Sequence, residues 1–391
     1  MTSFLAVERA VRTAAPHALL DTARAALVEH YEAVAVDLLM ADYSLTVLQP
    51  VTALPHTARA LPVHSSPEGR AFGSQEPYGQ YAAGDGTVAL HLPVTVRGDR
   101  LGILTVRLSR QRCTPEAIEE LTEIAELLGH EIIVAERDTD LYLQARRVSR
   151  LTLAAEMQWQ LLPGRACARQ EYAIGAQLEP AYAIHGDNFD WATTAETLTL
   201  TVTNGMGEGI DASLLTNLAV NALRNARRAG IGIADQAALA DQAIYGQHRG
   251  AAYVSTLILS FDLATGQAQV VDAGSPQLWR QRDRTVERVP FEAQLPLGMF
   301  DETAYVAQDF HALPGDRLVF VSDGVYDAAT RAGEAYGERA LARAIQAASL
   351  LPAAAVPRAV LRELASTRDT DADTADDALV VCLDWFGRDE G

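Results

Sequence analysis

Cysteine is scarce in this sequence of 391 residues: Cys113, Cys167 and Cys382 lie far apart, and none belongs to a Cys-x-x-Cys pair. This spacing argues against a disulfide framework or a cysteine-rich zinc site and predicts reduced thiols. Long hydrophobic runs are missing too, since no apolar stretch approaches the roughly 18 residues of a membrane-spanning helix. The apolar N-terminal stretch carries charged residues, Glu8 and Arg9 among them, so we do not expect it to be a secretory signal. We therefore expect a cytoplasmic protein without a membrane partner.

Basic residues are also in short supply. The sequence has 51 acidic against 32 basic side chains and a net charge of −19. Nucleic acid is an unsuitable main partner, because phosphate backbones are bound by surplus Lys and Arg. The acidic excess fits either a solvated surface or the binding of cations. With 49% hydrophobic and 21% charged residues, the chain is expected to be globular, and its length predicts two domains.

Residues 1–115 have the pattern of a mixed α/β unit. Helical apolar spacing comes first, then two strand-like runs, and then a hairpin in "VALHLPVTVRGDRLGILTVRLS" that turns at Arg97–Arg100. This order, together with the loop "GRAFGSQEPY", resembles a GAF domain over roughly residues 10–135. The resemblance implies a sensor domain that binds a small ligand, whose identity the sequence does not reveal. The alternative is a GAF-like dimerisation unit with no ligand.

Residues 116–162 are expected to be mostly helical. Thr114 and Pro115 form a favourable helix start, and apolar residues then recur at spacings of three and four. They are Leu121, Ile124, Leu128, Ile132 and Ala135. Such a seam suits a second helix, and the pattern continues to about Leu162, so we expect a coiled-coil-like linker and a homodimer. A helix packed on its own domain would show the same seam.

Residues 163–391 are rich in strands, and acidic or amide side chains follow several of them next to glycine. They are Asp187 and Asp190 in "IHGDNFDW", Asn204 in "TVTNGMGEG", Asp323 in "VFVSDGVYDA", and Asp376 and Asp377 in "TADDALVV". Strand alternation predicts that Asn204, Asp323 and Asp376 each continue an apolar face. Buried carboxylates are costly unless something neutralises them, which indicates a bound cation. Oxygen ligands without Cys or His favour Mg²⁺ or Mn²⁺.

Several motifs occur in a family-specific order over roughly residues 150–386. They are "AAEMQWQLLP", "LEPAYAIHGDNFDW", "NGMGEGIDASLL", "VDAGSPQLW", "LPLGM", "PGDRLVFVSDGVYDA" and "DDALVV". This series resembles the SpoIIE/RsbU branch of the metal-dependent serine/threonine protein phosphatases (PPM). The resemblance implies an α+β chain whose residues 163–391 form an α/β/β/α sandwich with two metals at one end.

The resemblance also assigns roles. Asp187, with Asp190 close behind it, would act in catalysis, and Asp187 would also lie at the metals. Asn204 stands where the family has a bridging Asp, Gly205 would offer its carbonyl, and Asp323 and Asp376 would complete the ligand set, with Asp377 as a substitute for Asp376. A water activated by the metals would attack the phosphate in line. The implied substrate is a phosphorylated anti-sigma-factor antagonist (STAS) protein.

Departures from the family pattern centre on Asn204. A carboxamide has one usable oxygen and no charge, so its presence should weaken a metal pair. Ser275, Glu208 and Leu379 also depart from the usual residues, at positions we expect to be peripheral to metal ligation. Asn204 leaves three interpretations open: an introduced substitution that inactivates a phosphatase, a natural residue in a slow or one-metal phosphatase, and a pseudophosphatase that binds a phosphoprotein without turnover.

A different interpretation of the same loop is nucleotide binding at Gly205-x-Gly207-x-Gly209. A dinucleotide fold needs a second parallel strand with an acidic end about twenty residues later. Here that interval is helical and contains "RNARRAG", and no Gly-Lys-Ser/Thr follows. The loop is therefore expected to form a tight turn at a metal centre.

Overall fold

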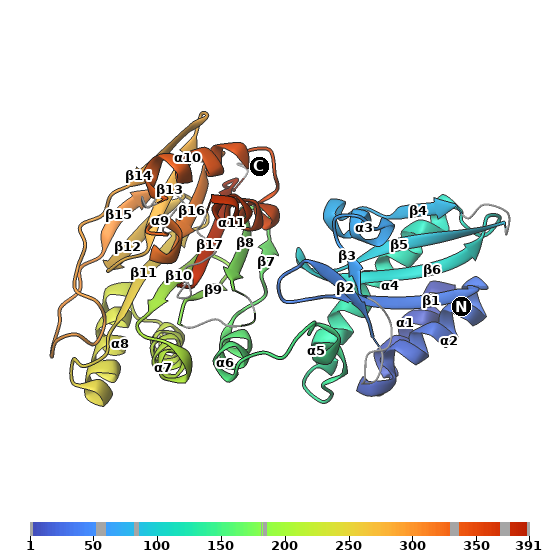
Figure 1. The fold of residues 1–391 in the computed structure, drawn as a ribbon, viewed down its shortest axis with the longest axis horizontal. Coiled ribbons are helices and arrows are strands. Elements are labelled where there is room, and N and C mark those ends of the chain that lie inside the picture. The colour runs from blue at the N-terminus through green and yellow to red at the C-terminus, as the bar shows by residue number, and fades with distance from the viewer. Residues whose placement is uncertain are drawn as a thin grey trace. The chain divides into compact units, whose positions relative to one another are not determined.

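Two compact units, Met1–Arg150 and Leu151–Gly391, make up the chain. The structure is a computed structural model and describes residues 3–51, 60–81, 86–180, 182, 186–328, 336–367 and 376–388. Figure 1 shows each unit as one or more antiparallel sheets covered by helices. No helix in these ranges has the length and apolar character to span a membrane.

The N-terminal unit is built on one six-stranded antiparallel sheet in the order β3-β2-β1-β6-β5-β4. Its strands are β1 Ala35–Ala41, β2 Val47–Pro50, β3 Leu61–Pro62, β4 Tyr78–Tyr81, β5 Thr87–Val96 and β6 Asp99–Ser109. The predicted hairpin is confirmed: Val96 pairs with Asp99, and Arg97 and Gly98 both have positive φ, as a two-residue primed turn requires.

Helices cover both faces of this sheet. They are α1 Ser3–Thr13, α2 Leu19–Tyr31, α3 Pro67–Ser74 and α4 Pro115–Ala135, with a short 3₁₀ turn at Pro16–Ala18. Helices α1, α2 and α4 share one apolar core with the sheet, and α3 covers a second cluster around Phe72. A mixed α/β unit is therefore present, while its resemblance to a GAF domain stays a prediction.

The predicted continuous linker over residues 116–162 is wrong. Helix α4 ends at Ala135, and only the short helices α5 Leu141–Ala145 and α6 Leu153–Leu161 follow. The apolar seam of α4 is buried in the core of its own unit, and Gly129 lets the helix approach Val94 and Val96 closely. The N-terminal unit therefore runs to residue 150, and the seam that suggested a partner helix packs on the unit's own sheet.

The C-terminal unit is a sandwich of two antiparallel sheets, ordered β15-β12-β11-β10-β9 and β14-β13-β16-β17-β8-β7. Its strands are β7 Ala166–Ala168, β8 Tyr172–Glu179, β9 Asn188–Thr193, β10 Thr197–Gly205, β11 Val254–Asp262, β12 Gln267–Ala273, β13 Gln277–Arg282, β14 Thr285–Val289, β15 Gln308–His311, β16 Arg317–Val321 and β17 Ala378–Trp385. Phe261 of the first sheet stacks on Trp385 of the second, with ring centroids 5.4 Å apart.

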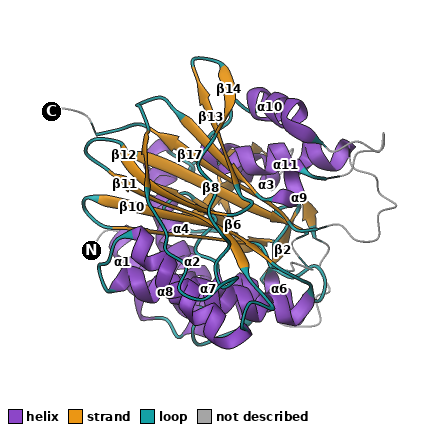
Figure 2. Ribbon diagram, turned by 90° about the vertical axis from the view of Figure 1, so that its left-hand side faces the viewer, coloured by secondary structure: helices purple, strands orange, loops and turns teal. Residues whose placement is uncertain are grey.

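Helices form the outer layers of this sandwich, as Figure 2 shows. Helices α7 Gly209–Arg228 and α8 Ile233–His248 pack on the five-stranded sheet, and α10 Gly337–Ala347 and α11 Val356–Thr367 pack on the six-stranded sheet. The short α9 Asp323–Tyr326 and a 3₁₀ turn at Ala353–Ala355 complete the described elements. The predicted α/β/β/α layering is confirmed. Strand β10 is antiparallel to both neighbours, so it is not part of a dinucleotide-binding βαβ unit.

Candidate metal centre

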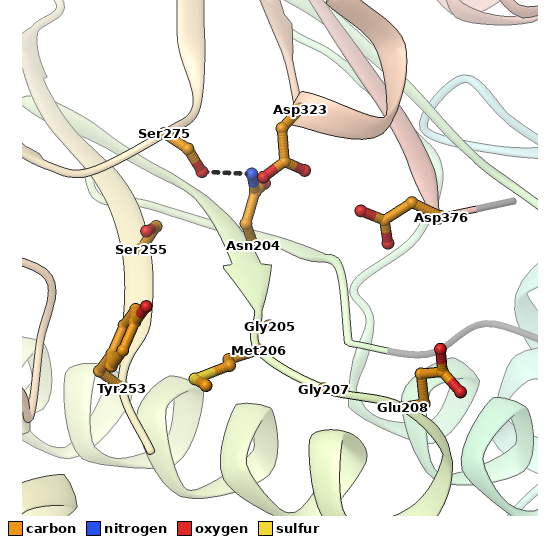
Figure 3. A pocket seen from close by; sticks show the side chains of 10 residues that line it. All are labelled: Asn204, Gly205, Met206, Gly207, Glu208, Tyr253, Ser255, Ser275, Asp323 and Asp376. Carbon is orange, nitrogen blue, oxygen red and sulfur yellow. Dashed lines mark hydrogen bonds between the residues drawn. The ribbon is translucent and has the colours of Figure 1, made fainter. Parts of the chain in front are cut away.

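A cavity of about 530 Å³ opens at one end of the sandwich, where strands from both sheets end. The side chains and backbone that line it come from β10 and the following loop, from β11, from the turn before β13, and from the segments that carry Asp323 and Asp376 (Figure 3). They are Asn204, Gly205, Met206, Gly207, Glu208, Tyr253, Ser255, Ser275, Asp323 and Asp376. Four of the predicted metal-site residues therefore meet at this cavity: Asn204, Gly205, Asp323 and Asp376.

Strand alternation along β10 brings Asn204 to the cavity. Leu198 pairs with Phe261, whose ring contacts the opposite sheet, so Leu198, Leu200 and Val202 face the space between the sheets. Asn204 continues this face at the end of the strand and is buried. The face predicted for Asn204 from the sequence is therefore confirmed.

The same parity argument is wrong for Asp323 and Asp376. Val319 and Val321 of β16 pack under helices α10 and α11, on the outer face of their sheet. Strand β16 ends at Val321, and Asp323 is already the first residue of α9, so a turn brings it to the cavity. Asp376 likewise precedes β17, whose Ala378 and Val380 belong to the outer cluster. Alternation applies only within a strand, and both aspartates lie beyond one.

Two glycines, Gly186 and Gly205, allow the backbones of their two segments to approach closely beside the cavity. A Cβ on Gly205 would lie 2.5 Å from both the carbonyl oxygen of Gly186 and Oγ1 of Thr216, and a Cβ on Gly186 would lie 2.8 Å from the Cα of Gly205. Thr216 Oγ1 donates a 2.7 Å hydrogen bond to the Gly186 carbonyl. The backbone approach of the two loops therefore requires glycine at both positions.

Asp187 is not among the residues that line the cavity, and the charges that affect its pKa are acidic. It is 3% exposed, and burial, followed by Asp377, raises its pKa well above the usual value, with smaller effects from Asp323 and Asp376. A hydrogen bond from Ser322 acts in the opposite direction. Such a carboxylate is stable in its charged form only if a cation or further donors approach it.

Asp377 supports the loop of Asp187 instead of lining the cavity. Its Oδ2 accepts hydrogen bonds from the backbone N–H groups of Gly186, at 2.8 Å, and Asp187, at 3.2 Å. The side chain is buried, whereas the neighbouring Asp376 is exposed at the cavity. This arrangement favours Asp376 over Asp377 as a direct ligand.

Asp323 lies next to Asn204 and Ser275. Burial, followed by Asp376, raises the pKa of Asp323, and hydrogen bonds from Gly324, Asn204 and Ser275 lower it in part. Asn204 Nδ2 donates to Ser275 Oγ at 2.5 Å (Figure 3). Ser275 is thus not one of the predicted ligands, but it contacts one of them directly.

Asp190 is not part of this centre, contrary to the prediction. It pairs across the sheet with Thr201, whose side chain lies on the face opposite to that of Asn204. Its two oxygens accept hydrogen bonds from Arg224, at 2.7 Å, and Arg227, at 2.9 Å, both on α7. Asp190 therefore fastens α7 to the sheet and has a structural role.

Two supporting residues, Thr216 and Ser322, were missed in the sequence. Thr216 holds Gly186, and the Ser322 hydroxyl accepts a 2.9 Å hydrogen bond from the Leu379 N–H. Thr216 lies seven residues after Gly209 within a helix, so no local pattern marks it as a partner of Gly186. Ser322 directly precedes Asp323, and this adjacency to a predicted ligand was the one available signal.

The donor set fits a hard divalent cation. Asp187 Oδ2 and Asn204 Oδ1 are buried oxygens without a hydrogen-bond partner among the described residues. Within the same ranges no three His, Cys, Asp or Glu side chains form a ready-made metal cage. A divalent ion bound here would therefore take carboxylates together with the Asn204 amide and main-chain carbonyls, which suit Mg²⁺ or Mn²⁺.

Comparison with known proteins gives one family match. The model described as "Stage II sporulation protein E (SpoIIE)" matches residues 194–386. Phosphoserine phosphatase RsbU of Bacillus subtilis (strain 168) is 23% identical over 209 residues, which cover 53% of this chain and 62% of RsbU. This chain thus matches about three fifths of that relative's length.

Solved structures resemble the C-terminal unit as well. The SiaA-PP2C domain of Pseudomonas aeruginosa has a TM-score of 0.51 and 21% identity, and covers 60% of this chain and 94% of its own. The PP2C domain of SpoIIE from Bacillus subtilis, solved with a fragment of its regulatory domain, has a TM-score of 0.48 and 18% identity, covering 56% and 66%. The likeness to the SiaA domain shows a common fold.

Proposed function

We propose that the chain hydrolyses phosphoserine or phosphothreonine in a protein partner with the help of Mn²⁺ or Mg²⁺, because its C-terminal unit matches the SpoIIE family model and is similar to the phosphatase RsbU. The observation that carries this proposal is the acidic cluster at the end of the sandwich. Asp323 and Asp376 line the cavity with Asn204 and Gly205, and the buried Asp187 lies next to Asp377, whose Oδ2 accepts a hydrogen bond from the Asp187 N–H. Such a cluster is suited to binding cations.

The residues of the chain divide into ligands and supports. Asp323, Asp376, Asn204 and the Gly205 carbonyl would hold the metal from the cavity, with Asp187 behind them. Asp377 fixes the loop of Asp187 through two backbone N–H groups. When bound, a divalent pair supplies an activated water and charge neutralisation for the phosphate.

The substrate that we propose is a phosphorylated anti-sigma-factor antagonist of the STAS type, in a partner-switching pathway. The support is the match to RsbU, whose name describes a phosphoserine phosphatase. The N-terminal unit would act as the sensor that regulates this reaction. Phosphate release from a phosphoserine-bearing STAS protein, compared with the same protein phosphorylated on tyrosine, tests the substrate class.

A second function, a binding module without turnover, is favoured by one specific observation. Asn204 occupies the place of a bridging carboxylate in the family pattern, and its Nδ2 bonds to Ser275. A neutral amide offers one oxygen to a cation, so the metal pair would be weaker than with aspartate. In this alternative the domain binds a phosphoprotein and releases it unchanged.

Hydrolysis of p-nitrophenyl phosphate in Mn²⁺ separates the two functions. We expect turnover by the native chain and, at limiting Mn²⁺, about tenfold faster turnover by Asn204→Asp, which corresponds to about 1.4 kcal/mol of ligand strength. Asn225→Asp, the same change at an exposed site on α7, is the matched control and should leave the rate unchanged. Turnover by Asn204→Asp alone supports the binding module, and no turnover by either protein contradicts a phosphatase.

A further inference from the structure

Asn204 and Ser275 are two departures from the family pattern that touch each other. Asn204 Nδ2 donates to Ser275 Oγ at 2.5 Å, and both side chains line the same cavity as Asp323, whose pKa they lower. The contact joins the end of β10 to the turn before β13, which are 71 residues apart in the sequence. In Figure 3 the two side chains point toward each other at the edge of the cavity.

The backbone around Ser275 fixes where its hydroxyl lies. Tyr326 Oη donates a 2.9 Å hydrogen bond to the Ser275 carbonyl oxygen. The preceding Gly274 has a φ of +136°, and a Cβ there would lie 2.4 Å from Ser255 Oγ. This conformation and close approach suit glycine alone, so the turn is held in one place.

The hydrogen bond between Asn204 and Ser275 runs from the amide to the hydroxyl. A serine hydroxyl has one proton to donate, and an ionised carboxylate can only accept. Ser275 Oγ accepts from Asn204 Nδ2, so the amide presents its NH₂ group to Ser275, and the hydroxyl proton points away from that contact. The amide oxygen is therefore turned away from Ser275, and it is buried without a hydrogen-bond partner among the described residues.

We propose that Ser275 is a positioning residue that turns the Asn204 carboxamide so that Oδ1, and not the NH₂ group, faces the metal. This inference rests on the proposed metal-dependent function. An amide oxygen is an adequate ligand for a hard cation, but a rotated amide would direct two N–H groups at it. With aspartate at position 204 either oxygen can bind, and the orienting hydroxyl is no longer needed.

Calorimetric titration of Mn²⁺ into the full chain tests this inference through binding alone. The set comprises the native chain, Ser275→Ala, Asn204→Asp and the double variant. We expect Ser275→Ala to weaken Mn²⁺ binding about tenfold when Asn204 is present, which corresponds to about 1.4 kcal/mol. In the Asn204→Asp background the same change should alter the affinity by less than about twofold.

Two controls separate orientation from loss of structure. Ser260→Ala makes the same chemical change on β11, outside the cavity lining, and should leave Mn²⁺ affinity unchanged. Ser275→Thr keeps the hydroxyl, whereas Ser275→Val has nearly the same shape without it, so only the threonine variant should retain native affinity. This pair keeps the test valid if Ser275→Ala fails to fold.

The outcomes distinguish this inference from the proposed function. Equal losses in both backgrounds, or no loss when Asn204 is present, overturn the positioning role while leaving the metal site intact. Mn²⁺ binding by Asn204→Asp but not by the native chain also overturns it, because Asn204 would then not act as a ligand. If no member of the set binds Mn²⁺, the proposed function itself fails.

Discussion

Asp187 and Asp190 are three residues apart and both almost fully buried, but the charged groups around the two carboxylates differ. Asp190 lies on the helix-facing side of the five-stranded sheet, where Arg224 and Arg227 bind its two oxygens. Asp187 lies at the end of the sandwich, and the charges that act on it are the carboxylates of Asp377, Asp323 and Asp376. Asp190 thus has its counter-ions within the chain, whereas the charges near Asp187 are acidic, which is the arrangement that the proposed cation site would use.

The difference shows how to separate structural from functional carboxylates. A buried charge that meets basic side chains contributes to the architecture, and removing it leaves those partners unpaired. A buried charge among like charges costs stability, and such a cost is typical of a site retained for binding. The following three predictions test this division, beginning with the largest expected effect.

Asp190→Ala should destabilise the C-terminal unit by about 3 kcal/mol, because two mostly buried guanidinium groups lose their partner. Arg224 also donates a 2.7 Å hydrogen bond to the Leu161 carbonyl, so the seating of α6 on α7 should loosen. Urea unfolding measures the loss. Mn²⁺ affinity should change little in the folded protein. A loss of Mn²⁺ affinity comparable to that of Asp187→Asn would mean that Asp190 does take part in the metal centre.

Asp187→Asn should have the opposite effect on the metal-free protein. Removing one charge from the acidic cluster should stabilise it by about 1 kcal/mol, or about 2–4 °C in Tm for a unit of this size. Thermal unfolding in EDTA measures this gain in the metal-free protein, and thermal unfolding in Mn²⁺ measures the stabilisation by bound metal. The native chain should gain about 2.7 kcal/mol at Mn²⁺ 100-fold above its Kd, and the variant much less. A lower Tm in EDTA would contradict repulsion at Asp187.

His91 in the N-terminal unit offers a smaller test with a pH readout. Its ring is buried, Nδ1 contacts Thr105 Oγ1 at 3.0 Å, and Glu68 lies 3.9 Å away. Burial lowers the pKa of His91, and the attraction of Glu68 offsets this only in part. The unfolded chain therefore binds the proton first, so the unit should lose stability as the pH falls below about 6.5.

Urea unfolding of the full chain at pH 7 and pH 5 measures this slope. His91→Gln should reduce the pH dependence, because glutamine has no proton to gain in this range. A native unit that becomes more stable on acidification would mean that Glu68 dominates over burial. In that case His91 would resemble Asp190, as a buried charge with its counter-ion supplied by the chain.

Much of the C-terminal unit was predictable, because its signals are local. The alternation of "TLTLTVTN" gives the buried face of β10. The same alternation is enough to place Asn204 on that face. The glycines of the following loop mark a tight turn, and the distance between Gly205 and Gly186 leaves no space for a side chain. Ordered motifs carried the family assignment, which no single motif could support.

The wrong predictions concern sequence patterns that are compatible with more than one structure. The seam of α4 is the same whether it packs on a second helix or on a sheet, and here it packs on its own sheet. Parity was extended past the ends of β16 and β17, where turns decide the direction of Asp323 and Asp376. Asp190 was grouped with Asp187 by proximity in sequence, although their side chains serve different sites.

The sequence by itself determined many of the strands and turns of the C-terminal unit and the chemistry of its candidate site, because periodicity, turn residues and carboxylate types act over a few residues. The layers of the sandwich were expected only from the family resemblance. Tertiary structure alone decided which carboxylates meet and which cations reach them. Cross-strand register, which pairs Asp190 with Thr201, and helix packing, which brings Arg224 and Arg227 to it, join residues far apart in the chain. The contact of Asn204 with Ser275 has the same origin, since 71 residues separate the two and only the folded sandwich brings them together.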